Sequence, residues 1–175
     1  MKFTLNNKDV SVNQIFFYSV KGSNKKISSS KDLSAEIKED LQLQLDEESL
    51  NAKSGEMVFY RRKEGHILCV ALDSGKQSAE DIRLLAGNIY KKLKAERLIG
   101  ITVSIDELGH RDKAEALQAM VEGFLMSSYT FDTFKKKPEK EAPELIIDFL
   151  SKSNNASMKK SLEEAVIMGE GVNFT

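Results

Sequence analysis

The sequence has little of what several kinds of protein need. Its single cysteine, Cys69, cannot form a disulfide within the chain, which indicates a reducing compartment. Lysine and arginine number 26 against 27 aspartates and glutamates, and the net charge is -1. A charge this small creates no field that would draw the chain to nucleic acid or to an anionic membrane. We therefore expect no nucleic-acid partner.

Long apolar runs are absent as well. No run approaches the ~20 apolar residues that cross a bilayer. Residues 1–10 lack the apolar stretch and the cleavage site of a signal peptide. The 175 residues, 41% of them hydrophobic, suit one globular domain with a buried core. We therefore expect a cytoplasmic protein of one domain, residues 1–175, with no membrane partner.

Familiar catalytic motifs are also missing. The sequence contains no G-x-S-x-G, H-E-x-x-H or C-x-x-C. Cys69 lies in the apolar run HILCVAL, where a buried structural thiol is favoured over a nucleophile that needs an electropositive, partly exposed setting. His66 opens the same run without a partner nearby in the sequence. These residues predict no catalytic, cofactor-binding or metal site.

Helical and strand patterns alternate from Gly55 onward, which predicts an α/β fold with three layers, α/β/α, around a central mixed sheet. The clearest helix has Asp81 three residues after Ser78, close to a capping box. The predicted helices span Ser78–Glu96, Asp112–Ser127 and Ser157–Gly169. The predicted strands span Ile15–Val20, Met57–Arg62, His66–Leu72, Leu98–Ile105 and Leu145–Leu150.

Other segments predict a strand pairing, the place of one strand in the sheet, and less regular structure. Met57–Arg62 and His66–Leu72, joined by a short link, predict a β-hairpin. The continuous apolar centre of Leu98–Ile105 predicts a central strand covered on both faces. Met1–Leu5 is a candidate first strand. Lys21–Asp32 is interpreted as a polar loop, and Leu33–Leu50 as a short helix followed by irregular structure.

The loop Leu72–Ser78 joins a strand to a helix, where α/β folds bind phosphates. It holds one glycine, Gly75, followed by Lys76. A phosphate cradle needs several glycines so that backbone amides can approach the anion. An ordinary strand-to-helix turn is therefore the favoured interpretation.

A second candidate, IDELGHRDK, gathers carboxylates and an imidazole that resemble metal ligands. It contains Asp106, Glu107, His110 and Asp112. These residues stand at a predicted helix start, however, where acidic side chains cap the helix and favour its dipole. Capping is therefore the favoured role.

The stretch VEGFLMSSYTFDTFKKK runs from an apolar helical stripe into aromatics and lysines. Ser127 and Ser128 are expected to end the helix, and the aromatics to cover an edge of the core: Tyr129, Phe131 and Phe134. The basic run Lys135–Lys140 is followed at once by acidic residues. A solvated strand exit is favoured over a nucleic-acid contact.

Part of this stretch resembles the leucine (cytosol) aminopeptidase family, in which a helix ending in E-G-x-x-L is followed by Y-x-F-D-x-[YF]-K. The matching residues are Glu122, Gly123, Tyr129, Phe131, Asp132, Phe134 and Lys135. SLEEAVIMGEGVNFT resembles the family's next helix, which leads to an Arg-Asp-Leu motif just beyond Thr175. A departure is the turn Asp73-Ser74-Gly75, where the family has Gly-Leu-Gly.

The resemblance implies the N-terminal, non-catalytic domain of such an enzyme, with a macro-domain-like fold, ending at the linker to a C-terminal catalytic domain. It implies that the parent enzyme removes N-terminal residues from peptides with two divalent metals, zinc or manganese, and forms a hexamer. The family's metal and catalytic motifs do not occur here. This domain would then act as scaffold, oligomer contact or access control.

Two alternatives stay open beside this reading. One is a free-standing module of macro-domain type that binds ADP-ribose or a related nucleotide, although the sequence lacks a glycine-rich phosphate loop. The other is a DNA-associated domain, because some bacterial members of the family have a second role in DNA binding. The net charge of -1 and the lack of a basic stripe count against it.

Overall fold

The computed structural model describes residues 1–8, 11–21, 25–29, 33–129 and 143–172. Within these residues a seven-stranded sheet has the order β1-β7-β6-β2-β5-β4, with β3 paired to β2 off this path. Five strands run parallel, whereas β3 and β4 are antiparallel to their neighbours. The sheet is therefore mixed, as predicted. Its strands are β1 (Lys2–Asn6), β2 (Gln14–Lys21), β3 (Lys26–Ser29), β4 (Met57–Tyr60), β5 (Ile67–Ala71), β6 (Gly100–Ser104) and β7 (Ile146–Leu150).

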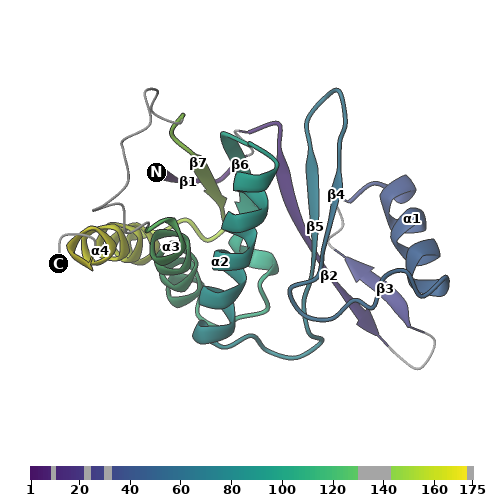
Figure 1. Cartoon of the computed structure of the whole chain (residues 1–175). Helices are drawn as coiled ribbons and strands as arrows, with labels where there is room; N and C mark the ends of the chain where they lie inside the picture. Colours follow the sequence, from purple (N-terminus) through teal and green to yellow (C-terminus); the bar gives the residue numbers. More distant parts are fainter. Residues whose placement is uncertain (9–10, 22–24, 30–32, 130–142, 173–175) are drawn as a thin grey trace.

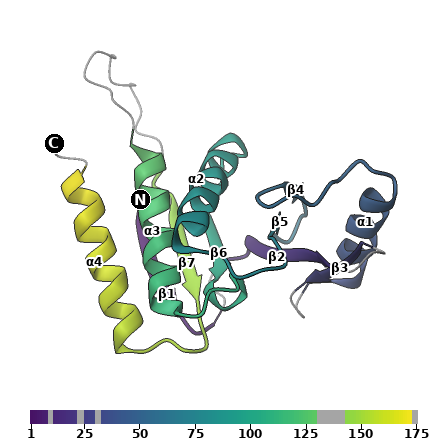
Figure 2. The same cartoon turned by 90° about the horizontal axis from the view of Figure 1, so that it is seen from below.

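Helices lie on both faces of this sheet. Figures 1 and 2 show α2, α3 and α4 side by side, with α1 at the far end beside β3 and β4. The predicted three-layer α/β/α architecture is confirmed. No helix in the described ranges is long and apolar enough to span a membrane. The helices are α1 (Ala35–Asp46), α2 (Ala79–Ala95), α3 (Lys113–Ser128) and α4 (Ala156–Val172), with a short 3-10 turn at Ile105–Glu107.

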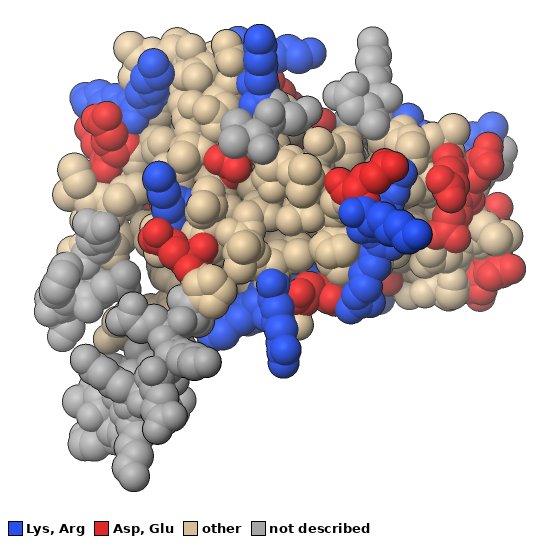
Figure 3. Space-filling model, turned by 90° about the horizontal axis from the view of Figure 1, so that it is seen from above, with Lys and Arg blue, Asp and Glu red and all other residues tan. Residues whose placement is uncertain are grey.

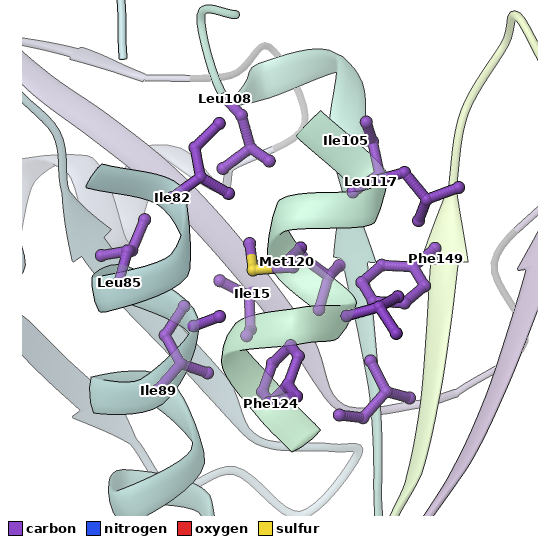
Figure 4. Close-up of a cluster of buried hydrophobic side chains, with 14 of the residues drawn as sticks. Ile15, Ile82, Leu85, Ile89, Ile105, Leu108, Leu117, Met120, Phe124 and Phe149 are labelled. Atoms are coloured by element: carbon purple, nitrogen blue, oxygen red, sulfur yellow. The ribbon is translucent and has the colours of Figure 1, made fainter. Parts of the chain in front are cut away.

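The alternation of side chains along the central strands divides the apolar residues between two cores. On β2, Ile15 and Phe17 join the larger core under α2, α3 and α4, which Figure 4 shows. Phe16 and Tyr18 join the smaller core under α1. Because successive strand residues point to opposite faces, one apolar strand serves both layers.

β6 lies between β7 and β2, so the prediction of a central strand is confirmed. Ile101 and Val103 are fully buried in the larger core. Thr102, on the reverse face, is 4% exposed, and its Oγ1 accepts a hydrogen bond from Ser11 N at 3.2 Å. Backbone from the β1–β2 connection thus contacts β6 on the face of the sheet opposite α2, α3 and α4.

One prediction for the first third of the chain is wrong. The expected polar loop contains β3, which pairs with the second half of β2. The Gln42 side chain of α1 also accepts a hydrogen bond from Ile27 N at 3.1 Å. Backbone pairing stabilises this strand, and with Ile27 as its one apolar residue it carries no hydrophobic pattern. The helix predicted at the start of Leu33–Leu50 is α1, which has 12 residues and buries Ile37, Leu41 and Leu45, and irregular structure follows it as predicted.

The end of α3 agrees only in part with the prediction. The helix ends at Ser128, as expected. Tyr129, however, is 46% exposed and does not cover the core, so that prediction is wrong. Phe131 and Phe134 lie outside the described residues.

Candidate functional site

The carboxyl ends of parallel strands meet at one edge of the sheet, where open α/β sheets bind ligands. Here a crevice of about 240 Å³ lies outside the ends of β2, β5 and β6. The residues that give it chemical character are Ser19, Lys21, Ser29, Gly75, Gln77 and Glu107. Most of the candidate phosphate loop Leu72–Ser78 lines this crevice, so a phosphate bound by the loop would lie here.

Side chains of the β5–α2 loop and of the first turn of α2 form hydrogen bonds with the backbone of the same segment. Gln77 is buried, and its Nε2 donates to Asp73 O at 3.2 Å. Ser78 Oγ accepts from Asp81 N at 3.1 Å, while Asp81 Oδ2 accepts from Ser78 N at 2.9 Å, so a capping box is present. The first amides of α2 are therefore partly satisfied within the protein, as a strand-to-helix turn requires.

An anionic ligand in this crevice would meet a carboxylate as well as Lys21. Glu107 lines it, and its Oε2 accepts from Phe17 N at 3.4 Å. Gly75 is exposed with open space around it, and Lys76 beside it is exposed as well. One exposed glycine and a carboxylate differ from the amide-rich nests that bind phosphates.

We expect ADP-ribose not to bind this chain with micromolar affinity. The pyrophosphate would face the Glu107 carboxylate without a cradle of backbone amides. Isothermal titration calorimetry of the 175-residue chain checks this. A micromolar dissociation constant, weakened in Gly75→Val but not in Gly171→Val, would favour the nucleotide-binding module instead.

The structure gives Asp106 and Asp112 separate structural roles. The Asp106 carboxylate accepts from Ser151 Oγ and Lys152 N, both at 2.9 Å, and so joins the ends of β6 and β7. Asp112 is the N-cap of α3, and its Oδ1 accepts from Ala114 N at 2.9 Å. The capping interpretation is confirmed for Asp112, while Asp106 acts as a tie between strands.

His110, the histidine of this candidate cluster, links two elements. Its Nδ1 lies 2.7 Å from Gln77 O, and its Nε2 lies 2.8 Å from Glu115 Oε2. Both partners are acceptors, so only the doubly protonated ring donates to both. The Gln77 carbonyl and then the Glu115 carboxylate raise the pKa of His110. The ring therefore links the β5–α2 loop to α3 through these two hydrogen bonds.

This link makes stability depend on pH. Because folding raises the pKa of His110, its contribution is fully present below the unfolded pKa, about 6.5, and is lost as the pH rises through the higher folded value. Above pH ~6.5 wild type should lose about 1 kcal/mol more stability than His110→Gln, since Glu115 is half exposed and such pairs are weak. Urea unfolding at several pH values measures this. Parallel slopes for the two proteins would refute the link.

Cys69 and His66 do not form a catalytic pair. Cys69 is fully buried in the smaller core, and burial, followed by the charge of Asp40, raises the pKa of its thiol to about 12. His66 Nδ1 accepts from Arg62 N at 3.3 Å, and its ring lies 5.5 Å from that of Phe59. Cys69 is thus a structural thiol, as predicted, and His66 closes the β4–β5 hairpin.

The described residues offer neither a metal-binding cluster nor a one-sided charge on the face that Figure 3 shows. Among the residues that the structure describes, no three His, Cys, Asp or Glu side chains are grouped so as to hold a metal ion. Figure 3 shows positive and negative side chains interspersed on the face seen from above. Lys135–Lys140 lie outside the described residues. No pattern in the sequence indicates the His110–Gln77 and Asp106–Ser151 contacts, because they join residues far apart in the chain.

Comparison with known proteins places this domain in a family. Residues 15–138 match the family model described as "Cytosol aminopeptidase family, N-terminal domain". A probable cytosol aminopeptidase of Bdellovibrio bacteriovorus is 29% identical over 188 residues, an alignment that covers 100% of this chain and 37% of the relative. Another from Sulfurihydrogenibium sp. is 27% identical over 115 residues, covering 65% of this chain and 23% of the relative. The chain thus spans well under half the length of both.

Solved structures show the same fold at low sequence identity. A mutant of tomato leucine aminopeptidase superposes with a TM-score of 0.73 and 19% identity, covering 98% of this chain and 36% of that one. The bottromycin maturation enzyme BotP, in complex with Mn, gives a TM-score of 0.63 and 13% identity, covering 94% of this chain and 30% of that one. Both similarities concern the fold.

Proposed function

This chain belongs to the cytosol aminopeptidase family, whose N-terminal domain it matches, and we propose that it is the non-catalytic N-terminal domain of a longer metallo-aminopeptidase. The parent enzyme would remove N-terminal residues from peptides in the cytoplasm. This domain would serve its C-terminal catalytic domain as scaffold, oligomer contact or access control. The match of residues 15–138 to an N-terminal domain model carries the proposal.

The roles of the candidate residues support a non-catalytic domain. Asp106 and Asp112 are engaged by backbone and side-chain donors of neighbouring elements. The side chain of His110 is 14% exposed and contacts two acceptors. His110 and Asp112 line one open hollow of about 620 Å³ at the start of α3, but the contacts of both side chains hold protein elements together. Their contacts position α3 and the strand ends instead.

The metals of the parent enzyme do not fit this part of the polypeptide. The described residues offer no group of three ligating side chains, whereas a two-metal hydrolase needs several carboxylates around ions roughly 3.5–4 Å apart. We propose that the C-terminal domain holds two divalent ions, zinc or manganese, which activate water and polarise the scissile carbonyl. The parent would assemble as a hexamer.

A fusion experiment tests the division of labour. We expect the 175-residue chain alone not to cleave leucyl-p-nitroanilide with Mn²⁺ or Zn²⁺. A chimera that joins it to the part of the Bdellovibrio relative outside the matched segment should cleave this substrate with metal present. Initial rates at equal concentration measure the difference, and that remaining part of the relative, expressed alone, is the control.

Substitutions at Asp106 and His110 test whether this domain contributes catalytic residues. Asp106→Ala and His110→Ala should leave the metal-dependent turnover of the chimera within about twofold once the chimera is folded, because neither residue touches the reacting atoms. Metal-dependent turnover by the 175-residue chain, abolished by either substitution, would show that the active site lies in this domain. An inactive but folded chimera would count against the proposed parent enzyme.

A further inference from the structure

A second hollow lies at the opposite edge of the sheet from the crevice, where β6 and β7 begin. Its volume is about 460 Å³, within the range of small-molecule sites. Its walls are mainly apolar and come from the end of α2, the start of β6 and the start of β7: Tyr90, Leu98, Ile99, Pro143 and Leu145. Ile99 is 56% exposed, so an apolar wall faces solvent here.

Two cations, Lys94 and Arg97, line this apolar hollow. Within the described part of the chain, neither side chain has an ion pair or a hydrogen bond. The acid between them in sequence, Glu96, is engaged by Lys92 at 2.8 Å and by Arg61. Two unpaired positive charges beside an apolar wall are complementary to a ligand with one anionic end and an apolar body.

Arg97 is the residue after the C-cap of α2, Glu96. Its φ is 56°, in the left-handed region, and Leu98 N donates to Leu93 O at 3.1 Å across the helix end. This is the position after a helix where glycine is usual, because a side chain there meets a steric cost. The helix dipole accounts for Lys94 within α2. Arg97, just beyond this end, is favoured by the same dipole, and Glu48 after α1 has a similar left-handed conformation, with φ 55°.

We propose that this hollow binds a small carboxylate with an apolar body, such as a medium-chain aliphatic acid. The carboxylate lies between Lys94 and Arg97, where the guanidinium can donate two parallel hydrogen bonds. The apolar body lies against Tyr90, Leu98 and Ile99, which removes exposed apolar surface from water. The proposal stands on this chain alone and does not depend on the proposed parent enzyme.

Three probes with the same apolar body separate charge from hydrophobicity. Octanoate, octanol and octylammonium are titrated into the 175-residue chain while amide NMR spectra are recorded. Octanoate should shift the amides of residues 90–99 and 144–146 in a saturable manner. Octanol should bind about tenfold more weakly, and octylammonium should not bind there, because charge-assisted hydrogen bonds to the carboxylate are lost.

Substitutions then test the two cations. Arg97→Gly removes the guanidinium while its backbone suits glycine, so the protein should stay folded and its affinity for octanoate should fall by about tenfold or more. Lys94→Gln should weaken binding as well. Lys91→Gln, an exposed lysine on the same helix outside the hollow, is the matched control and should bind as wild type does.

Several results would overturn the proposal. They are equal binding of octanoate and octylammonium, unchanged affinity in Arg97→Gly, or shifts centred on another surface. Self-association through this face, detected by sedimentation and insensitive to octanoate, would show that a second copy of the chain occupies the hollow instead.

Discussion

Replacing Gly123 by alanine should destabilise the fold by about 3 kcal/mol, because two helices meet at this glycine without room for a methyl group. A Cβ at Gly123 would lie 2.3 Å from the Arg83 carbonyl oxygen and 2.8 Å from Ala86 Cβ. The first contact is with backbone, so α2 and α3 would have to separate. In an exposed helix the same change stabilises by about 1 kcal/mol, so the expected sign is reversed. Denaturant unfolding measures it through the midpoint.

Two other helical glycines provide matched controls. At Gly87 the added Cβ would lie 2.5 Å from Ser127 Oγ, a hydroxyl that can rotate away, so Gly87→Ala should cost less than Gly123→Ala. At Gly171 nothing lies within 4 Å, so Gly171→Ala should be neutral or slightly stabilising. Equal effects at all three positions would show that α2 and α3 are not packed as closely as described.

The same contact explains the Glu-Gly pair on which the family resemblance partly rests. Gly123 lets α3 approach α2, and Glu122 beside it receives Arg83 Nε at 2.6 Å on its Oε2. Gln118 Nε2 donates to the other oxygen of the same carboxylate at 2.9 Å. The pair therefore holds two helices together on one face of the sheet. Its role in this domain is packing.

The elements with a strong local pattern could be predicted from the sequence. α2 has apolar residues at helical spacing between a capping box and lysines, and the structure places it within one residue of each predicted end. The β4–β5 hairpin, whose two strands are joined through Gly65 with φ 137°, is predicted from the sequence as well. In both, the residues that decide the structure are neighbours in the chain.

What could not be predicted depends on contacts between distant segments. β3 is held by backbone pairing to β2, and such pairing leaves no signature in polar residues like Ser28 and Ser29. The place of Asp106 is decided by Ser151, 45 residues away. The acidic cluster therefore resembled a metal site in sequence, although its members turn toward different partners in the fold.

Ile101→Ala should cost about 2–5 kcal/mol of unfolding free energy, the usual range for removing most of a buried aliphatic side chain. Ile101 is fully buried in the larger core and pairs in register with Ile147 on β7. Its strand lies between two others and is covered by α2 and α3, so neither the sheet nor the helices can collapse easily into the space. The lost transfer free energy and the cavity then add together.

A graded series separates this burial from a general effect of mutation. Ile101→Val removes one methylene group and should cost about 1 kcal/mol. Ile167, on α4, is 69% exposed, so Ile167→Ala should change stability by less than about 0.5 kcal/mol. Urea unfolding of the three variants under the same conditions gives the comparison. If Ile101→Ala cost less than about 1 kcal/mol, β6 would not be the central strand of the sheet, and the packing of α2 and α3 over it would have to be revised.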